Sequence, residues 1–228
     1  MYYFSLARTA LKVGISLYGY ENDKVVLIPN FLCDSVTGAL FEENINVVTY
    51  DLLDNLQPNW NELNCLCIEN NVFAVLMVHY FGQPSNSVSE IASFCLSHGA
   101  LFIEDATHVF LPVSGVGEIG DCVLYSPHKH LPVPDGAVLV VTSTGPSKLA
   151  KNEFAINLLN NAVAEMLASS VSSNTSSILW LVKRLAQRFG IRRSLSPVSF
   201  NVDSESNLSV QNYPRLSYLA MRLLPILR

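Results

Sequence analysis

The sequence predicts an α/β protein: a mostly parallel sheet with helices on both faces. Apolar runs alternate with segments of helical spacing from residue 24 to residue 105. The strongest strand candidate, 73–81, is a continuous apolar run without polar alternation, which suits a strand covered on both faces. Half of the 228 residues are hydrophobic and 14% are charged, so the chain can fill a sizeable core.

The first elements of this alternation are short. The run "VVLIP" (25–29) predicts a strand that ends at its proline, and residues 34–43 have helical spacing with apolar residues on one side. The run "INVVTYD" (45–51) predicts a second strand, and a helical turn or two is expected at 60–66.

The next elements are better marked. After the strand at 73–81, residues 87–99 predict a helix with Ser87 or Ser89 as its cap and Gly99 as its stop. The remaining strands are predicted at 100–105, 121–125 and 137–141. Ligands of such sheets bind at the carboxyl ends of the strands, which draws attention to His79, Asp105 and the turn around Lys129.

The chain changes character after residue 145. Helices are predicted at 148–167, at 178–189 and from 214 onward, separated by a serine-rich break (169–177) and a loop (192–212). We therefore expect an α/β domain over 1–145 and a helical extension over 146–228. The abrupt end suggests that something is missing.

Composition and charge exclude several classes of protein. The formal net charge is −5, and the basic cluster Lys183, Arg184, Arg188, Arg192 and Arg193 is typical of a solvated helix face, so no nucleic-acid partner is expected. No run approaches the ~20 apolar residues of a membrane helix, and charges at Arg8 and Lys12 interrupt any signal peptide. A soluble, cytoplasmic protein is expected.

Cysteine and histidine spacing argues against metals and disulfides. The five cysteines are odd in number and irregularly spaced, and Cys65 and Cys67 lack the two-residue gap of common zinc or redox pairs. The five histidines form no recognised zinc-binding pattern. We expect buried thiols in a reducing compartment and no metal site.

A lysine in a stiff turn is the first candidate for chemistry. "SPHKHLP" (126–132) places Lys129 between His128 and His130 and between prolines, in a turn that joins two predicted strands. A neutral lysine amine in a pocket can attack a carbonyl carbon. The alternative is a solvated loop charge.

Two other features fit the same chemistry. Asp105 ends the run "LFIED", where it is either a site carboxylate or a cap for the following turn. In "FSLARTAL" (4–11), Ser5 is placed to cap a helix that begins with Ala7 and Arg8. Free N–H groups at a helix start bind phosphate well, although an ordinary amphipathic helix explains the same pattern.

These segments together resemble a known family. The order "LARTAL", "VVLIPNFLCDSV", "VVTYD", "VLMVHYFGQP", "HGALFIEDATHVF" and "GEIGDCVLYSPHKHLPVPDGAVLVV" is similar to the DegT/DnrJ/EryC1/StrS aminotransferases over roughly residues 4–142. The resemblance implies the aspartate-aminotransferase fold (fold type I), pyridoxal 5′-phosphate as cofactor, and residues 1–145 as the cofactor-binding large domain. It further implies an amino-acid donor, expected to be glutamate, a keto or aldehyde acceptor, expected to be a nucleotide-linked sugar, and a homodimer.

The resemblance also assigns roles to individual residues. Lys129 would hold the cofactor as a Schiff base, Asp105 would pair with the pyridine nitrogen, and His108 would lie beside the ring. Ala7 and Arg8 would bind the phosphate, with a contribution from Ser126. Cys33 falls where many members place an aromatic ring that stacks on the cofactor.

The sequence also departs from the family. Leu124 and Tyr125 stand where a serine–aromatic pair is common, and Gly136-Ala137 replaces a glycine pair. Members are considerably longer and carry a small C-terminal domain, so the resemblance implies that this small domain is missing here. A non-catalytic or truncated protein on the same fold, with a binding or regulatory role, is therefore the alternative. A dehydration or decarboxylation with the same cofactor is a third reading, kept open by His128 and His130.

Overall fold

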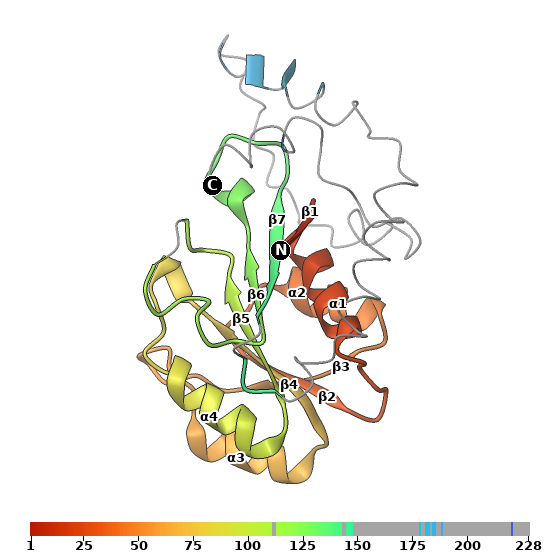
Figure 1. Ribbon diagram of the computed structural model, residues 1–228, viewed down its shortest axis with the longest axis vertical. Helices are drawn as coiled ribbons and strands as arrows, with labels where there is room; N and C mark the ends of the chain where they lie inside the picture. Colours follow the sequence, from red (N-terminus) through yellow and green to blue (C-terminus); the bar gives the residue numbers. More distant parts are fainter. Residues whose placement is uncertain are drawn as a thin grey trace.

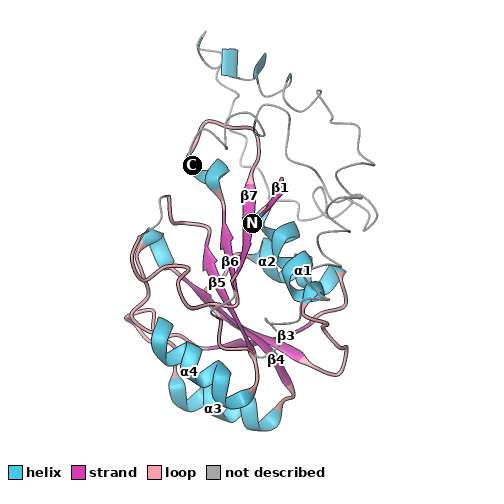
Figure 2. Ribbon diagram, viewed as in Figure 1, coloured by secondary structure: helices cyan, strands magenta, loops and turns pink. Residues whose placement is uncertain are grey.

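Among the described residues, seven strands form one sheet in the order β1-β7-β6-β5-β4-β2-β3 (Figure 1). The computed structural model describes residues 1–110, 113–142 and 145–147. It also describes isolated positions farther along the chain: Ile178, Leu181, Val182, Arg184, Leu185, Arg188 and Ala220. Figure 2 shows helices lying on both sides of this sheet, so the predicted fold class is confirmed.

The elements follow the predicted runs closely. The strands are β1 (Tyr2–Phe4), β2 (Val25–Pro29), β3 (Asn46–Tyr50), β4 (Val72–Val78), β5 (Leu101–Ala106), β6 (Cys122–Tyr125) and β7 (Ala137–Val141). The helices are α1 (Ala7–Leu17), α2 (Asp34–Glu42), α3 (Trp60–Glu69) and α4 (Val88–His98). Two 3₁₀ helices, Tyr80–Gly82 and Pro127–Lys129, follow β4 and β6.

The centre of the sheet is parallel. Strand β2 pairs with β3 and β4, β4 pairs with β5, and β5 pairs with β6, all in parallel. In this register Asp105 lies between Val78 on β4 and Leu124 on β6. Carboxyl ends of parallel strands meet at one edge, so Asp105 and both 3₁₀ helices are brought to the same edge of the sheet.

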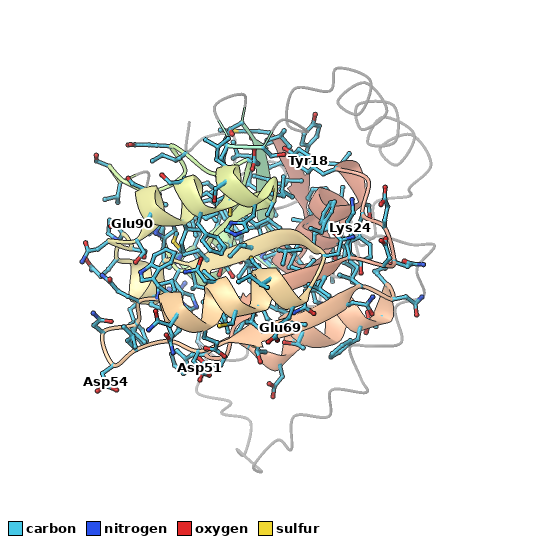
Figure 3. All side chains as sticks on the ribbon, turned by 90° about the horizontal axis from the view of Figure 1, so that it is seen from below. Tyr18, Lys24, Asp51, Asp54, Glu69 and Glu90 are labelled. Carbon is cyan, nitrogen blue, oxygen red and sulfur yellow. The ribbon has the colours of Figure 1, made fainter. Side chains whose placement is uncertain are left out.

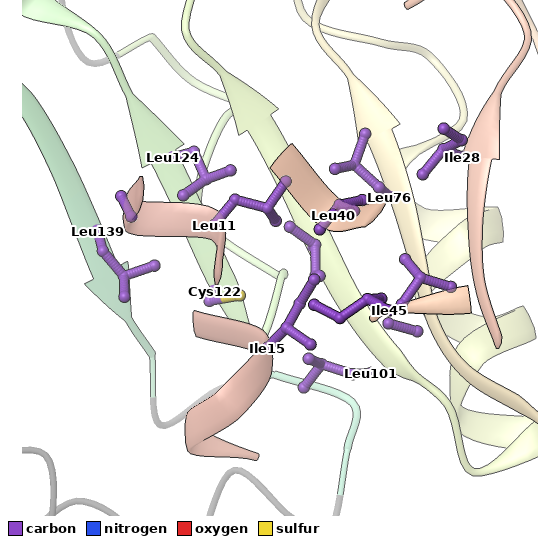
Figure 4. Packing of buried hydrophobic residues seen from close by; sticks show 14 of the residues in the cluster. Leu11, Ile15, Ile28, Leu40, Ile45, Leu76, Leu101, Cys122, Leu124 and Leu139 are labelled. Atoms are coloured by element: carbon purple, nitrogen blue, oxygen red, sulfur yellow. The ribbon is translucent and has the colours of Figure 1, made fainter. Parts of the chain in front are cut away.

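The two faces of the sheet are covered by different helices. Leu11 and Ile15 of α1 and Leu40 of α2 pack on one face against side chains such as Leu76 and Leu124 (Figure 4). Leu63 of α3 and Ile91 of α4 pack on the other face. Each such side chain is almost fully buried, which is worth roughly 1.5–3 kcal/mol apiece.

One edge of the sheet was not predicted. Strand β1 has only three residues and pairs antiparallel with β7, with Tyr3 opposite Val138. Strand β7 in turn pairs antiparallel with β6. A three-residue run carries too little periodicity to be recognised, and its partner lies more than 130 residues away along the chain.

Two predicted helix caps turn out differently. Leu6, not Ser5, is the N-cap of α1, and the prediction that Ser5 caps this helix is wrong. Ser5 lies one residue too early: its carbonyl accepts the Gly136 N–H (2.9 Å), and its buried Oγ is without a hydrogen-bond partner among the described residues. Ser87 is the N-cap residue of α4, but its side chain makes no capping hydrogen bond. Gly99 ends α4 in the left-handed conformation (φ 67°), as predicted.

The strand predicted at 73–81 ends earlier, at Val78. Phe81 and Gly82 have φ values of 55° and 78°, which no extended strand can accommodate. Gly82 is required here, because a Cβ atom would lie 2.7 Å from the His108 carbonyl oxygen. The turn therefore brings the residues after β4 against those after β5.

Several predictions lie outside the described residues. These are the helices at 148–167 and from 214 onward, the break at 169–177 and the loop at 192–212, so the extension predicted for 146–228 stays a prediction. In the described part, charged residues such as Asp54, Glu69 and Glu90 lie at the outer surface (Figure 3). None of the helices described is both long and apolar enough to cross a membrane. The described residues also contain no group of three or more potential metal ligands.

Candidate active site

A cavity of about 460 Å³ opens at the carboxyl ends of the parallel strands. Its size lies within the usual range of small-molecule sites, about 300–1,000 Å³. Its walls come from the start of α1, the segment before α2, and the turns after β4, β5 and β6. All the residues predicted for the site line it: Ala7, Arg8, Cys33, Asp105, His108, Ser126 and Lys129.

Lys129 is the last residue of the 3₁₀ helix that follows β6. Pro127 starts this helix, and the Lys129 N–H donates to the Ser126 carbonyl (3.0 Å). Lys129 Nζ donates to Thr107 Oγ1 at 3.1 Å, across the cavity wall formed by the end of β5. Lys129 itself is exposed, as the solvated-charge alternative requires, but its amine contacts the buried Thr107 at the cavity wall.

Asp105 lies near the end of β5 and is 6% exposed. Its Oδ1 accepts the Thr107 N–H at 2.9 Å, so the turn-capping contact considered above does exist. Among the described residues, no hydrogen bond reaches Oδ2. One carboxylate oxygen therefore fixes the turn, and the other is available to a ligand N–H in the cavity.

The histidines beside the lysine have structural contacts. His128 Nδ1 lies 2.8 Å from the Gly136 carbonyl oxygen, so this nitrogen carries the proton and donates to it. Ser126 Oγ lies 3.0 Å from the same nitrogen. His130 is exposed, and its ring packs 5.5 Å from that of Phe110. His128 thereby ties the lysine turn to the loop before β7.

His108 faces the cavity from the turn after β5. Partial burial lowers the pKa of His108, and the positive charge of Lys129 lowers it further. A neutral imidazole is therefore favoured beside the predicted ring position.

The start of α1 supplies the groups that suit an anion. No side chain caps this helix, which begins with Ala7 and Arg8. The N–H groups of a helix start have no partner within the helix itself. The fully buried Ser126 lines the same cavity. A helix N-terminus with an adjacent guanidinium is a favourable phosphate site.

Aromatic rings line the cavity near Cys33. Cys33 is exposed, and its Sγ lies 3.1 Å from Ser35 Oγ. The rings of Phe31 and Tyr80 stack with centroids 5.5 Å apart, and the Tyr80 hydroxyl donates to the Phe31 carbonyl oxygen (2.7 Å). Phe81 follows, with its side chain largely exposed. A planar ligand can therefore find aromatic surface here although Cys33 itself has none.

Sequence reasoning missed Thr107, Tyr80 and Phe81. Thr107 is an inconspicuous turn residue, and its importance appears only when the turn after β6 delivers Lys129 to it. Tyr80 and Phe81 fall within the strand predicted at 73–81. The adjacent glycine in "HYFGQP" is the signal that could have revealed a turn there.

These groups fit pyridoxal phosphate: a lysine amine, a carboxylate with an available oxygen, a helix N-terminus for phosphate and aromatic surface between them. A mostly parallel sheet that gathers them at one edge defines the large domain of a fold-type-I pyridoxal-phosphate enzyme. The chain belongs to the DegT/DnrJ/EryC1/StrS aminotransferase family, whose model matches residues 4–160. Enzymes of this family depend on pyridoxal phosphate.

Solved structures agree on the fold. DesI, crystallised in the presence of its TDP-sugar product, is 20% identical with a TM-score of 0.55, over 70% of this chain and 40% of that chain. A DegT DnrJ EryC1 StrS aminotransferase from Brucella abortus is 18% identical with a TM-score of 0.54, over 70% and 44%. PseC from Helicobacter pylori, an aminotransferase involved in pseudoaminic acid biosynthesis, is 19% identical with a TM-score of 0.52, over 65% and 42%.

The matched region is about two fifths of the length of these structures. No curated protein matches the sequence.

Proposed function

We propose that this chain carries the cofactor-binding half of a pyridoxal-phosphate-dependent aminotransferase. The observation that carries the proposal is a pair of hydrogen bonds at the cavity. Lys129 Nζ donates to Thr107 Oγ1, and the Thr107 N–H donates to Asp105 Oδ1. Family membership supports the same reaction class.

Each residue of the site has a separate role in the proposed reaction. Lys129 would hold the cofactor covalently through Nζ, and its released amine would act as the base and acid that moves a proton at the α-carbon of the amino donor. The negative charge of Asp105 would keep a proton on the ring nitrogen. Ala7, Arg8 and Ser126 would bind the phosphate. When bound, pyridoxal phosphate supplies an electrophilic carbonyl carbon and an electron-withdrawing ring.

We further infer glutamate as the donor and a nucleotide-linked keto or aldehyde sugar as the acceptor. The crystallisation of DesI with a TDP-sugar product and the role of PseC in pseudoaminic acid biosynthesis support a sugar acceptor. A homodimer, which rests on the resemblance, and a cytoplasmic location are part of the same proposal.

The test is to locate the cofactor on the chain. The full chain is mixed with pyridoxal phosphate, desalted, treated with borohydride and mapped by peptide mass spectrometry. We expect a yellow species that borohydride fixes on Lys129, and none in Lys129→Ala. Lys24→Ala is the matched control, because Lys24 pairs with Glu21 and does not line the cavity. An adduct that survives in Lys129→Ala would contradict the proposal.

The alternative, a non-catalytic protein on this fold, predicts a different result. Such a protein would form the Lys129 adduct, yet L-glutamate would not discharge it. Loss of the yellow species on adding glutamate, with formation of 2-oxoglutarate, separates the two. In an active enzyme, Lys129→Ala should abolish transfer while leaving the fold intact.

A further inference from the structure

Thr107 touches both residues on which the proposed chemistry depends. It follows β5 directly and is 6% exposed. Its hydroxyl oxygen accepts a hydrogen bond from Lys129 Nζ (3.1 Å), and its backbone N–H donates to Asp105 Oδ1 (2.9 Å). Among the described residues, no other residue forms hydrogen bonds with both side chains.

The position of Thr107 is fixed by the fold on both sides. Ala106, just before it, is opposite Tyr125 in the β5–β6 ladder, and the Val109 N–H closes the turn on the Ala106 carbonyl (2.9 Å). On the other side, the 3₁₀ helix after β6 delivers Lys129. The contact therefore joins two hydrogen-bonded turns at neighbouring strand ends.

A hydroxyl suits this position chemically. It can accept from an ammonium group and donate to a free amine, so it can pair with Lys129 in either state. An amine that alternates between a covalent bond and a free state needs a fixed place when released, because a long lysine side chain otherwise samples many rotamers.

We propose that Thr107 is a positioning residue: its hydroxyl holds the Lys129 amine within reach of the cofactor carbonyl, while its backbone N–H orients Asp105. This inference rests on the proposed function. The two contacts come from different parts of the residue, one from the side chain and one from the backbone. Side-chain variants can therefore remove the first and leave the second.

Three variants isolate the hydroxyl. Thr107→Val replaces the hydroxyl by a methyl group of similar size, Thr107→Ser keeps the hydroxyl and loses the methyl group, and Thr107→Ala loses both. We expect Val and Ala to slow borohydride-trapped adduct formation at Lys129 by about tenfold, the effect of losing one hydrogen bond to a charged group, and Ser to restore it. The pH profile of adduct formation should shift in Val and Ala but not in Ser.

Pyridoxal without its phosphate is the second probe. It reacts with Lys129 without help from the start of α1, so the same order of rates is expected for it. Urea unfolding of each variant reports folding separately from reactivity. If Val folds poorly, the comparison of Ser with Ala still decides the role of the hydroxyl.

The outcomes are distinct. Equal rates in Thr107→Val and the unmodified chain overturn the positioning role and leave the proposed function standing. A Ser variant as slow as Val also overturns it, because the methyl group would then be what matters. Absence of any Lys129 adduct in the unmodified chain overturns the proposed function, and this assignment with it.

Discussion

Two neighbouring carboxylates on β5, Glu104 and Asp105, face opposite sides of the sheet and are treated differently by the fold. Glu104 is fully buried and accepts from His79 Nε2 (2.9 Å), the Gly117 N–H (2.7 Å) and the Gly120 N–H (2.5 Å). Asp105 lines the cavity and accepts one hydrogen bond, from Thr107, among the described residues. A fully satisfied carboxylate holds the fold together, whereas a partly satisfied one in a cavity is ready to bind.

His79, which donates to Glu104, is itself fully hydrogen-bonded. His79 Nδ1 accepts the Ser85 N–H (3.1 Å), so the ring proton is on Nε2 and points at Glu104. Burial raises the pKa of the Glu104 carboxyl, but the hydrogen bonds from His79, Gly117 and Gly120 outweigh it and leave the pKa lowered. Glu104 is therefore held as an anion by donors that lie in fixed positions.

The largest expected effect comes from Asp105→Asn. The amide oxygen can still accept the Thr107 N–H, so stability should change little, but the negative charge is lost. We expect amino transfer to fall by about a hundredfold or more, as when a group that stabilises charge in an active site is removed. Steady-state rates and urea unfolding measure the two effects separately. Asp54→Asn, on the exposed surface, is the control. Equal activity in both variants would contradict the comparison.

Glu104→Gln should show the opposite pattern, a loss of stability. One carboxylate oxygen becomes an NH₂ group that faces backbone N–H donors, and we expect a loss of roughly 3 kcal/mol in the free energy of unfolding. Because the folded pKa of Glu104 is lowered, its contribution is present above the unfolded pKa and lost as pH falls through the folded value. The free energy of unfolding of the variant should therefore not show this loss at acidic pH.

Urea unfolding at neutral and acidic pH measures the Glu104 effect. Glu90→Gln, an exposed carboxylate in the first turn of α4, is the matched control and should cost less than about 1 kcal/mol through loss of its interaction with the helix dipole. If Glu104→Gln is no less stable than Glu90→Gln, Glu104 is not the structural carboxylate described above.

A third buried carboxylate, Asp121, lies between these extremes. It accepts the Phe102 N–H (2.8 Å) and the Ser147 N–H (2.9 Å). Burial raises the pKa of Asp121 from 3.8 to about 6, because these two donors do not offset desolvation. A raised carboxyl pKa means that stability is fully present below the unfolded value and is lost as pH rises through the folded value.

We expect the Asp121 ionisation to remove roughly 2–3 kcal/mol of stability between pH 4 and pH 7, at 1.36 kcal/mol per unit of pKa difference. Asp121→Asn cannot ionise, so its unfolding free energy should change less over this range, whatever its absolute value. Denaturant unfolding at several pH values measures the slope. An unchanged slope in the variant would show that another group causes it.

The central fold could be predicted because its information is local. Continuous apolar runs mark β2, β4 and β5, and Gly99 marks the end of α4, each within a dozen residues of sequence. β1 could not be predicted in this way, because three residues become a strand only through pairing with β7.

The site could be predicted in part, for the same reason. Asp105 and Lys129 stand out because strand ends and stiff turns mark positions where ligands bind. The contact of Thr107 with Lys129 depends on how two turns meet, and the hydrogen bonds of Glu104 depend on a glycine loop 13 to 16 residues farther along. No pattern in either segment encodes these pairings.

The smallest effect is expected for Ser5, a buried polar residue outside the cavity. It tests whether incomplete hydrogen bonding by itself marks a binding group. Its Oγ is buried without a partner among the described residues, yet Ser5 is not among the residues that line the cavity, so no ligand is expected to satisfy it. A buried hydroxyl without a hydrogen bond contributes nothing to stability and costs desolvation, so Ser5→Ala should be neutral or stabilise the fold by up to about 1 kcal/mol. The backbone hydrogen bond from the Gly136 N–H to the Ser5 carbonyl is unaffected.

Thermal and urea unfolding measure the effect of Ser5→Ala. Ser93→Ala is the control, because Ser93 Oγ donates to the Ser89 carbonyl on the exposed face of α4. A clear loss of stability in Ser5→Ala would mean that an unsatisfied polar atom outside the cavity is also useful, and incomplete hydrogen bonding would then no longer distinguish Asp105 as a binding group.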